Sequence, residues 1–410
     1  MRHARPVLLV LLAAVAAGAL AACDDGGAEG PAAAGGPVVL EYWTSQNPQE
    51  RAWAEILVAE WNAAHPDIQV HTQPIPAGQS SEEVLLAAVV AGTTPDLCSN
   101  IWPGVLNDFV RAGGVVALDE MPGFDSLMAA RIPAELADAF TSADGHVYQL
   151  PWKTNPILML YNVDLFQEAG VAQPPATYGA YHAAAARVTA DTNGDGQTDR
   201  WMGARDIRPI WWQRTFDVYP LYLAASHGRT FFDASGALAI DEPALREVYG
   251  FFQTLYAEGH YPLSTLQGNA FAQRRVATEF TGPWTAGWLI ENAPDIRFDF
   301  APIPVPDGFT GAPVTYGDTK NIALFSSTEH PEEAWAFAQF LVSAEADRRL
   351  IEMTRQIPIR AGLLDDPALA AFFEATPFMR RFAQQAPHTR GIDAVPSLQE
   401  VFDAVAQSYE

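Results

Sequence analysis

The chain has 410 residues, 49% of them hydrophobic, and a formal net charge of −25 at pH 7. So acidic a surface repels nucleic acid and anionic lipid, which argues against both as partners. About 370 residues follow a segment rich in Gly, Ala and Pro, which is too long for one ordinary core and sufficient for two.

An export signal opens the chain. Basic residues precede an apolar run from Val7 to Leu20, and small residues then lead to Cys23. This order is typical of a secretory signal, and the apolar run is too short to span a membrane. A cysteine at this point is typical of a bacterial lipobox, so we expect removal of residues 1–22 and a diacylglycerol on Cys23. The alternative is a plain secretory signal with an incidental cysteine.

Residues 23–37 contain mostly Gly, Ala and Pro, a composition that predicts a flexible leash. Asp24 follows the lipidated cysteine and resembles the inner-membrane retention signal of Gram-negative lipoproteins. We therefore expect an exported protein that is lipid-anchored to the cytoplasmic membrane and faces the periplasm or the cell exterior. With Cys23 lipidated, Cys98 has no partner for an intrachain disulfide, so we expect it to be a small buried hydrophobe.

The first hundred residues alternate between strand and helix patterns. This order predicts a mostly parallel sheet with helices on both faces. Ligands of such sheets bind beyond the carboxyl ends of the strands, which points to the loops at 43–46 and 100–102. The expected elements are strands at 38–43, 68–73 and 95–100, and helices at 49–65 and 81–91.

Several segments together resemble the family 1 extracellular solute-binding proteins of bacterial ABC importers, the group that includes maltose- and trehalose-binding proteins. No single segment is diagnostic, but their joint order across nearly the whole chain is. They are the strand ending in Trp43, then Glu60-Trp61-Asn62, His65-Pro66-Asp67-Ile68, Ala91-Gly92-Thr93-Thr94-Pro95-Asp96, Leu160-Tyr161-Asn162-Val163-Asp164-Leu165-Phe166, Phe280-Thr281-Gly282-Pro283-Trp284, His330-Pro331-Glu332-Glu333-Ala334-Trp335 and Gln356-Ile357-Pro358-Ile359-Arg360.

The resemblance implies a two-lobe α/β fold, the type II periplasmic-binding-protein fold. Each lobe is expected to hold a mostly parallel sheet flanked by helices, with crossing hinge segments between the lobes. The first lobe is expected at 38–148 plus 303–354, and the second at 149–302 plus 355–410. Crossings are expected near Leu150, at Ala301-Pro302-Ile303-Pro304 and near Gln356-Ile357-Pro358.

The same resemblance implies a binding protein that closes on a sugar or oligosaccharide and delivers it to the membrane permease of an ABC importer. The implied partners are a carbohydrate, the permease subunits and the membrane through the lipid anchor, and we expect a monomer. Three alternatives remain open: a binding protein for a compatible solute or polyol, a lipid-anchored glycoside hydrolase, and a receptor that feeds a sensor.

Aromatic side chains are the expected binding groups, because flat rings cover the C–H faces of a sugar while polar groups bind its hydroxyls. The chain has 11 tryptophans, and several follow strands or lie in predicted loops. Trp284 is the strongest candidate, since family members present a stacking aromatic in the Gly-Pro-Trp turn. Of the adjacent pair Trp211 and Trp212, we expect only one to contact ligand. The full predicted set is Trp43, Thr44, Gln46, Asn100, Trp102, Trp152, Asn155, Trp211, Trp212, Trp284, Tyr316 and Asp318.

The segment from Asp191 to Asp199 resembles the front half of a calcium loop, because oxygen-bearing side chains alternate and a glycine allows the turn. The bidentate glutamate of an EF-hand is absent, since Met202 holds its position. The alternative is an Asx-rich turn without metal. No cofactor is expected for sugar binding, and any calcium would be structural. Its expected ligands are Asp191, Asn193, Asp195, Gln197 and Asp199.

Motifs of catalysis are absent from the sequence. There is no Gly-x-Ser-x-Gly elbow, phosphate loop, His-Glu-x-x-His motif or dinucleotide glycine pattern. Neither Lys153 nor Lys320 follows a serine by three residues, which excludes a Ser-x-x-Lys hydrolase. We therefore predict that the protein is not an enzyme.

Overall fold

A computed structural model describes residues 36–408, except 78–79, 134–135, 137–139, 143, 234 and 394. The expected signal at 1–22, the lipidation site Cys23 and the leash up to residue 35 lie outside the described residues. In the described part of the chain, no helix has the length and hydropathy needed to cross a membrane.

The larger sheet contains seven strands in the order β2-β1-β3-β8-β4-β9, with β10 beside β8. Strand β1 pairs in parallel with β2 and β3, as the sequence predicts, whereas β8 runs antiparallel to β3 and to β4. The strands are β1 (Val38–Thr44), β2 (Ile68–Pro74), β3 (Leu97–Ile101), β4 (Leu150–Pro156), β8 (Thr315–Leu324), β9 (Ile357–Pro358) and β10 (Thr389–Arg390).

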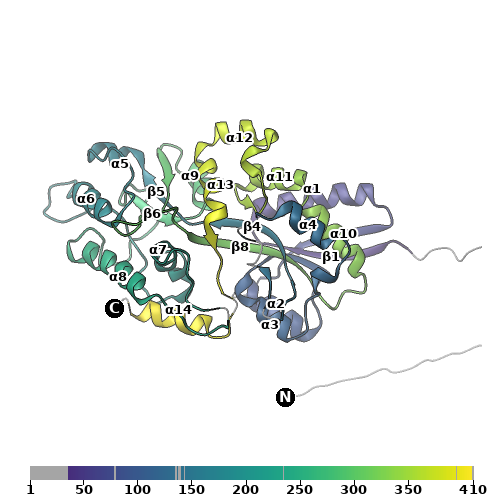
Figure 1. The fold of residues 1–410 in the computed structure, drawn as a ribbon. Coiled ribbons are helices and arrows are strands. Elements are labelled where there is room, and N and C mark those ends of the chain that lie inside the picture. Colours follow the sequence, from purple (N-terminus) through teal and green to yellow (C-terminus); the bar gives the residue numbers. More distant parts are fainter. Residues whose placement is uncertain are drawn as a thin grey trace, which may run out of the picture. The chain divides into compact units, whose positions relative to one another are not determined.

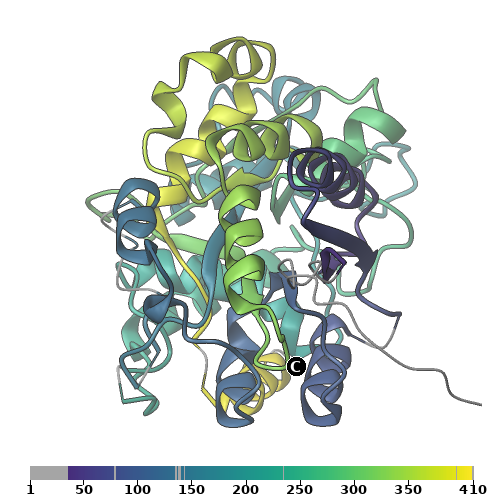
Figure 2. The same ribbon diagram turned by 90° about the vertical axis from the view of Figure 1, so that its right-hand side faces the viewer.

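Helices cover both faces of this sheet (Figures 1 and 2). One buried cluster joins α1 and α10 to one face, and a second cluster joins α2 and α3 to the other. Caps fix the helix ends: the Asn47 side chain accepts two backbone N–H bonds at the start of α1, and Gly92 adopts positive φ at the end of α2. The helices are α1 (Pro48–Ala64), α2 (Ser81–Ala91), α3 (Pro103–Arg111), α4 (Phe124–Arg131), α10 (Pro331–Leu341) and α11 (Ala344–Thr354).

The smaller sheet has the order β6-β5-β7, and both of its pairings are antiparallel. Its strands are β5 (Leu158–Asn162), β6 (Thr278–Thr281) and β7 (Phe298–Ala301). The expectation of a mostly parallel sheet is therefore wrong for this half. The helices between β5 and β6 would be long enough for the crossover that a parallel pair needs, yet β6 runs antiparallel to β5. The direction in which a strand enters a sheet depends on how distant segments pack, which the local residue pattern does not encode.

Two buried clusters flank the smaller sheet. One joins it to α6, α7, α8 and α14, and the other to α9, α12 and α13. The C-terminal helices thus pack with this sheet. The helices are α5 (Val163–Glu168), α6 (Tyr178–Val188), α7 (Val218–Ala225), α8 (Glu242–Ala257), α9 (Trp284–Asn292), α12 (Ala370–Ala375), α13 (Pro377–Gln385) and α14 (Leu398–Gln407).

Strands β4 and β8 form a crossing ribbon between the two groups of elements (Figure 1). Strand β4 ends at Pro156 in the larger sheet and β5 begins at Leu158 in the smaller one, so the chain crosses at Ile157. It returns between Ala301 and Thr315. The lobe boundaries at 148/149, 302/303 and 354/355 stay a prediction.

Candidate functional site

Two adjoining cavities lie between elements of the two sheets. One, the Trp102 chamber, has a volume of about 800 Å³, and the other, the Trp284 chamber, has a volume of about 520 Å³. Both are lined by Trp212, Phe216 and Asp318, so the two chambers share a wall. We call the two chambers together the aromatic cleft. Its size fits a ligand of several sugar rings better than a single small ion.

Trp102 follows β3 and precedes the first residue of α3, as its position in the sequence suggests. Its indole Nε1 donates to the Tyr316 hydroxyl over 3.4 Å, and its ring centroid lies 6.3 Å from that of Trp211. A Cβ atom on Gly104 would lie only 2.3 Å from the Trp102 ring. Glycine is therefore required at position 104 for this ring position.

Trp284 begins α9 and is 38% exposed. Phe216 meets its ring edge-to-face at a centroid distance of 5.8 Å, a favourable geometry for aromatic pairs. A Cβ on Gly282 would lie 2.1 Å from the Trp284 ring, the same arrangement that Gly104 makes with Trp102. Each of these tryptophans thus lies across a glycine of its own turn, with part of its ring open to the cleft.

Both Trp211 and Trp212 line the Trp102 chamber, and the expectation that only one of them contacts ligand stays a prediction. They begin a short 3₁₀ helix, Trp211–Thr215, in which consecutive side chains are separated by about 120°. Trp212 is 49% exposed, and its ring contacts Phe216 at 6.5 Å. Trp212 also lines the Trp284 chamber whereas Trp211 does not, in keeping with side chains that point in different directions.

Alternate residues of β8 give the cleft its polar wall, because every second side chain of a strand faces the same side. The Tyr316 hydroxyl donates to Asp318 Oδ1 over 3.4 Å, and Lys320 Nζ lies 3.6 Å from the same carboxylate. Burial raises the pKa of Tyr316 well above its ordinary value, so this phenol stays protonated and remains a donor. All three residues line the Trp102 chamber, and sugar binding by Tyr316 and Asp318 stays a prediction.

Trp43 and Trp152 lie in the core of the larger sheet instead of the cleft, contrary to the expectation. Trp152 is fully buried, and its ring is 5.4 Å from that of Trp53 on α1. Trp43 packs with Ile75 and other buried side chains on the face covered by α2 and α3. Both residues belong to strands whose faces are covered by helices, which the sequence pattern did not reveal.

The other predicted polar residues also lie outside the lining of the aromatic cleft. Thr44 is buried, while Gln46 is exposed and donates from Nε2 to the Ile75 carbonyl at 3.1 Å. Asn100 has a φ of 73° beside a register shift in β3. Asn155 is 2% exposed and donates to Gln356 Oε1 at 3.0 Å.

Asn155 belongs to a buried polar network that the sequence analysis missed. Lys153 and Gln356 both donate to Glu50 at the start of α1, and Gln356 accepts from Asn155. Burial alone would raise the pKa of Glu50, but the Lys153 ammonium and the hydrogen bonds hold it below its ordinary value. The network ties α1 to β4 and to the segment before β9. The presence of Lys153, one of two lysines in the chain, was the available signal.

The Trp284 chamber has a charged lining that the sequence analysis also missed. Arg205 Nη2 lies 2.8 Å from Asp217 Oδ2, and Arg214 Nη2 lies 3.2 Å from the same oxygen. Glu279 on β6 lines the chamber as well. The sequence could have pointed to Glu279, because it is the one acidic residue of its strand and lies five positions before Trp284.

The loop from Asp191 to Asp199 folds around its own backbone. Asp191 accepts from the N–H groups of Asn193, Gly194 and Gly196, and Asp199 accepts from Thr192 and Asn193. Within the described chain, no group of three or more His, Cys, Asp or Glu residues is arranged to hold a metal ion. Calcium binding by this loop, including Asp195 and Gln197, stays a prediction.

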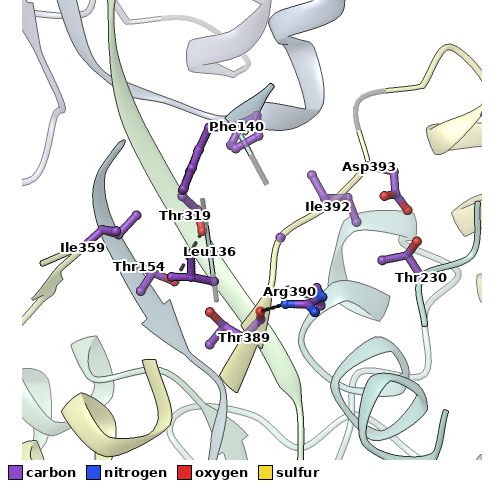
Figure 3. Close-up of a pocket in the computed structure, with 12 residues that line it drawn as sticks. Leu136, Phe140, Thr154, Thr230, Thr319, Ile359, Thr389, Arg390, Ile392 and Asp393 are labelled. Carbon is purple, nitrogen blue, oxygen red and sulfur yellow. Dashed lines mark hydrogen bonds between the residues drawn. The ribbon is translucent and has the colours of Figure 1, made fainter. Parts of the chain in front are cut away.

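A further cavity of about 350 Å³ lies on the other face of the crossing ribbon (Figure 3). Thr154 and Thr319 are opposite each other in the β4–β8 register, one residue from the pair formed by Asn155 and Asp318. Because successive side chains of a strand point to opposite faces, the threonines face away from the aromatic cleft. The lining contains one aromatic side chain, Phe140, so it offers little surface for stacking a sugar.

Comparisons with known proteins identify the family of the chain. The family model for bacterial extracellular solute-binding proteins matches residues 44–348. A putative binding protein of Brucella abortus is 26% identical over 382 residues, covering 91% of this chain and 86% of the relative. The maltotriose-binding protein of Pyrococcus abyssi is 26% identical over 381 residues, covering 90% and 76%.

Solved structures share the fold. An uncharacterized Listeria monocytogenes protein superposes with a TM-score of 0.80 at 24% identity, covering 90% of this chain and 93% of that one. The sugar-binding protein MalE of Xanthomonas citri has a TM-score of 0.72 at 19% identity and covers 91% of each chain. These likenesses confirm the predicted periplasmic-binding-protein fold.

Proposed function

The chain belongs to the bacterial extracellular solute-binding proteins, and from that premise we propose that it captures a neutral sugar or oligosaccharide in the aromatic cleft. The observation that carries the proposal is the position of Trp102, Trp211, Trp212 and Trp284 around two adjoining chambers. The printed name of the Pyrococcus relative, a maltotriose-binding protein, supports an oligosaccharide ligand.

Stacking supplies the affinity in this proposal. Micromolar binding requires about 8 kcal/mol. One aromatic ring buried against a sugar face contributes about 1.5–3 kcal/mol, so two or three rings supply much of this. Tyr316, Asp318 and Lys320 then select among sugars, because an unpaired buried polar group costs about 1–3 kcal/mol.

Closure follows from where the binding groups reside. Trp102 and Asp318 belong to elements of the larger sheet, whereas Trp212 and Trp284 belong to elements that pack with the smaller sheet. A sugar that contacts both groups stabilises the arrangement in which they are close, since only differential affinity shifts a conformational equilibrium. We propose that the closed form is what a membrane permease of an ABC importer recognises.

The cellular setting is part of the proposal. The family is extracellular, and the lipobox at Cys23 supports a lipid anchor on the outer face of the cytoplasmic membrane. We propose a monomer that needs no cofactor to bind sugar. We also propose that it lacks glycosidase activity, which incubation with oligosaccharides and an assay for new reducing ends would test.

The deciding experiment is a calorimetric titration of the mature chain with neutral trisaccharides: maltotriose, cellotriose, xylotriose and chitotriose. We expect at least one of them to bind with micromolar affinity and to raise the melting temperature. Glycine betaine and sorbitol serve as controls for the compatible-solute and polyol classes. Binding of a control without binding of any trisaccharide would contradict the proposal.

A further inference from the structure

The Trp284 chamber contains four carboxyl groups, and three of them have cationic partners. These are Asp206 with Arg208, Asp217 with Arg205 and Arg214, and Asp318 with Lys320. Each cation takes up part of the hydrogen-bonding capacity of its carboxylate. The fourth carboxyl group, that of Glu279, differs from the others.

Glu279 lies on β6, where it is paired in register with Leu160 of β5. It is half-buried, and the hydrogen bond that shapes its ionisation comes from the nearby Thr281 hydroxyl. No ion pair among the described residues includes Glu279, whereas Asp206, Asp217 and Asp318 each have one. A carboxylate that lines a cavity without a cation beside it has acceptor capacity to spare for a ligand.

On the premise of the proposed function, we propose that Glu279 selects the sugar in the Trp284 chamber. Its carboxylate accepts hydrogen bonds from two neighbouring hydroxyls of a ring stacked on Trp284, so capture requires ionised Glu279 and weakens as the solution is acidified. The arrangement suits this role, because an indole covers the face of a sugar and leaves the hydroxyls at its rim. An ionised carboxylate only accepts hydrogen bonds, which matches vicinal hydroxyl donors.

Glu279 is expected to change its charge near neutral pH. Burial raises its pKa to about 7, with a partial offset from the Thr281 hydroxyl. The chamber presents Arg205, Asp206, Asp217, Tyr261 and Asp318 as its other charged or titratable groups. Hydrogen bonding from Arg208 lowers the pKa of Asp206, and burial raises that of Tyr261 well above its ordinary value, so neither changes charge near pH 7.

Affinity for the sugar is expected to fall as the pH falls. If binding needs the ionised form, a group that titrates near pH 7 weakens apparent affinity by about tenfold between pH 8 and pH 6. Sugar hydroxyls that donate to the carboxylate favour its ionised form, so binding below pH 7 releases a proton. Glu279→Gln removes the charge at nearly constant shape. We expect it to bind about tenfold more weakly at pH 8 and to lose the pH dependence.

The test is calorimetry with the same four trisaccharides at pH 6, 7 and 8, each in two buffers of different ionisation enthalpy. Wild type should release a proton on binding at pH 6, and Glu279→Gln should not. Glu291→Gln is the matched control, because Glu291 is exposed on the adjoining helix α9 and lies outside the cleft. Circular dichroism checks that the variants fold.

The outcomes separate the two proposals. Proton release that Glu279→Gln abolishes supports the assignment. A trisaccharide that binds wild type without proton release, or with the same pH profile in both proteins, overturns the role of Glu279 and leaves sugar capture standing. If Glu279→Gln fails to fold, proton release by wild type alone decides. No binding of any trisaccharide to wild type overturns the proposed function, and the role of Glu279 with it.

Discussion

The indoles near the larger sheet and those around the aromatic cleft have opposite surroundings. Trp53 and Trp152 are at most 1% exposed and contact each other, whereas Trp212 and Trp284 are 49% and 38% exposed. Trp53 belongs to helix α1, which covers strand β4 at Trp152. In the second pair, each ring begins a helical turn at the edge of a cavity. Similar side chains thus serve packing in one region and present open faces in the other.

A position directly after a strand is therefore a weak guide to whether an indole binds ligand. The role of an indole depends on whether another helix or strand covers its ring. The two regions should therefore respond oppositely to mutation: truncation of a covered indole should affect stability, and truncation of an open one should affect affinity.

The largest effect is expected for Trp152→Ala. Removing a fully buried Trp from a packed core costs about 3–5 kcal/mol of unfolding free energy, because the cavity collapses only in part. Urea denaturation followed by circular dichroism measures this loss. At a temperature where the variant is folded, its affinity for the trisaccharide bound by wild type should change by less than about threefold. An affinity loss without a stability loss would place Trp152 at the site.

Trp284→Ala is the opposite case. We expect affinity to fall by at least about tenfold, because a stacked ring contributes about 1.5–3 kcal/mol. The melting temperature without ligand should stay nearly unchanged. Trp288→Ala is the matched control, since Trp288 is 42% exposed on the same helix and lies outside the cleft. Equal affinities for the two variants would remove Trp284 from the site.

Gly282→Ala sharpens the comparison without removing an indole. The new Cβ would collide with the Trp284 ring and displace it, so we expect affinity to fall by roughly threefold to tenfold. In a Trp284→Ala background the same change should have no further effect. Gly287→Ala is the control, because a Cβ there meets no atom within 4 Å. Additive losses in the double mutant would show that Gly282 acts separately from Trp284.

The smallest effect on stability is expected in the loop from Asp191 to Asp199, which contains no indole. Asp191→Ala removes the acceptor for three backbone N–H groups at an exposed loop, so we expect only a small loss of unfolding free energy. Thermal melts of both proteins with calcium and with a chelator then test the calcium prediction. A wild-type melting temperature that rises with calcium, and does so less in the variant, would support metal binding.

The sequence revealed the fold class and part of the cleft, for identifiable reasons. Cys98 is a buried hydrophobe, as expected, and six of the predicted binding residues line the cleft: Trp102, Trp211, Trp212, Trp284, Tyr316 and Asp318. Tyr316 and Asp318 do so from within strand β8, whereas the sequence placed them before a strand. The antiparallel smaller sheet, the burial of Trp152 and the partners of Glu50 depend on contacts between distant segments. Local patterns of residues do not encode such contacts.

Binding of a neutral oligosaccharide in the aromatic cleft would be seen in a crystal structure of the mature chain with the tightest-binding trisaccharide. We expect electron density for a sugar ring stacked on Trp284, with its hydroxyls directed to Glu279. Density for the sugar in the cavity beside Thr154 and Thr319, with the aromatic cleft free of sugar, would contradict the account.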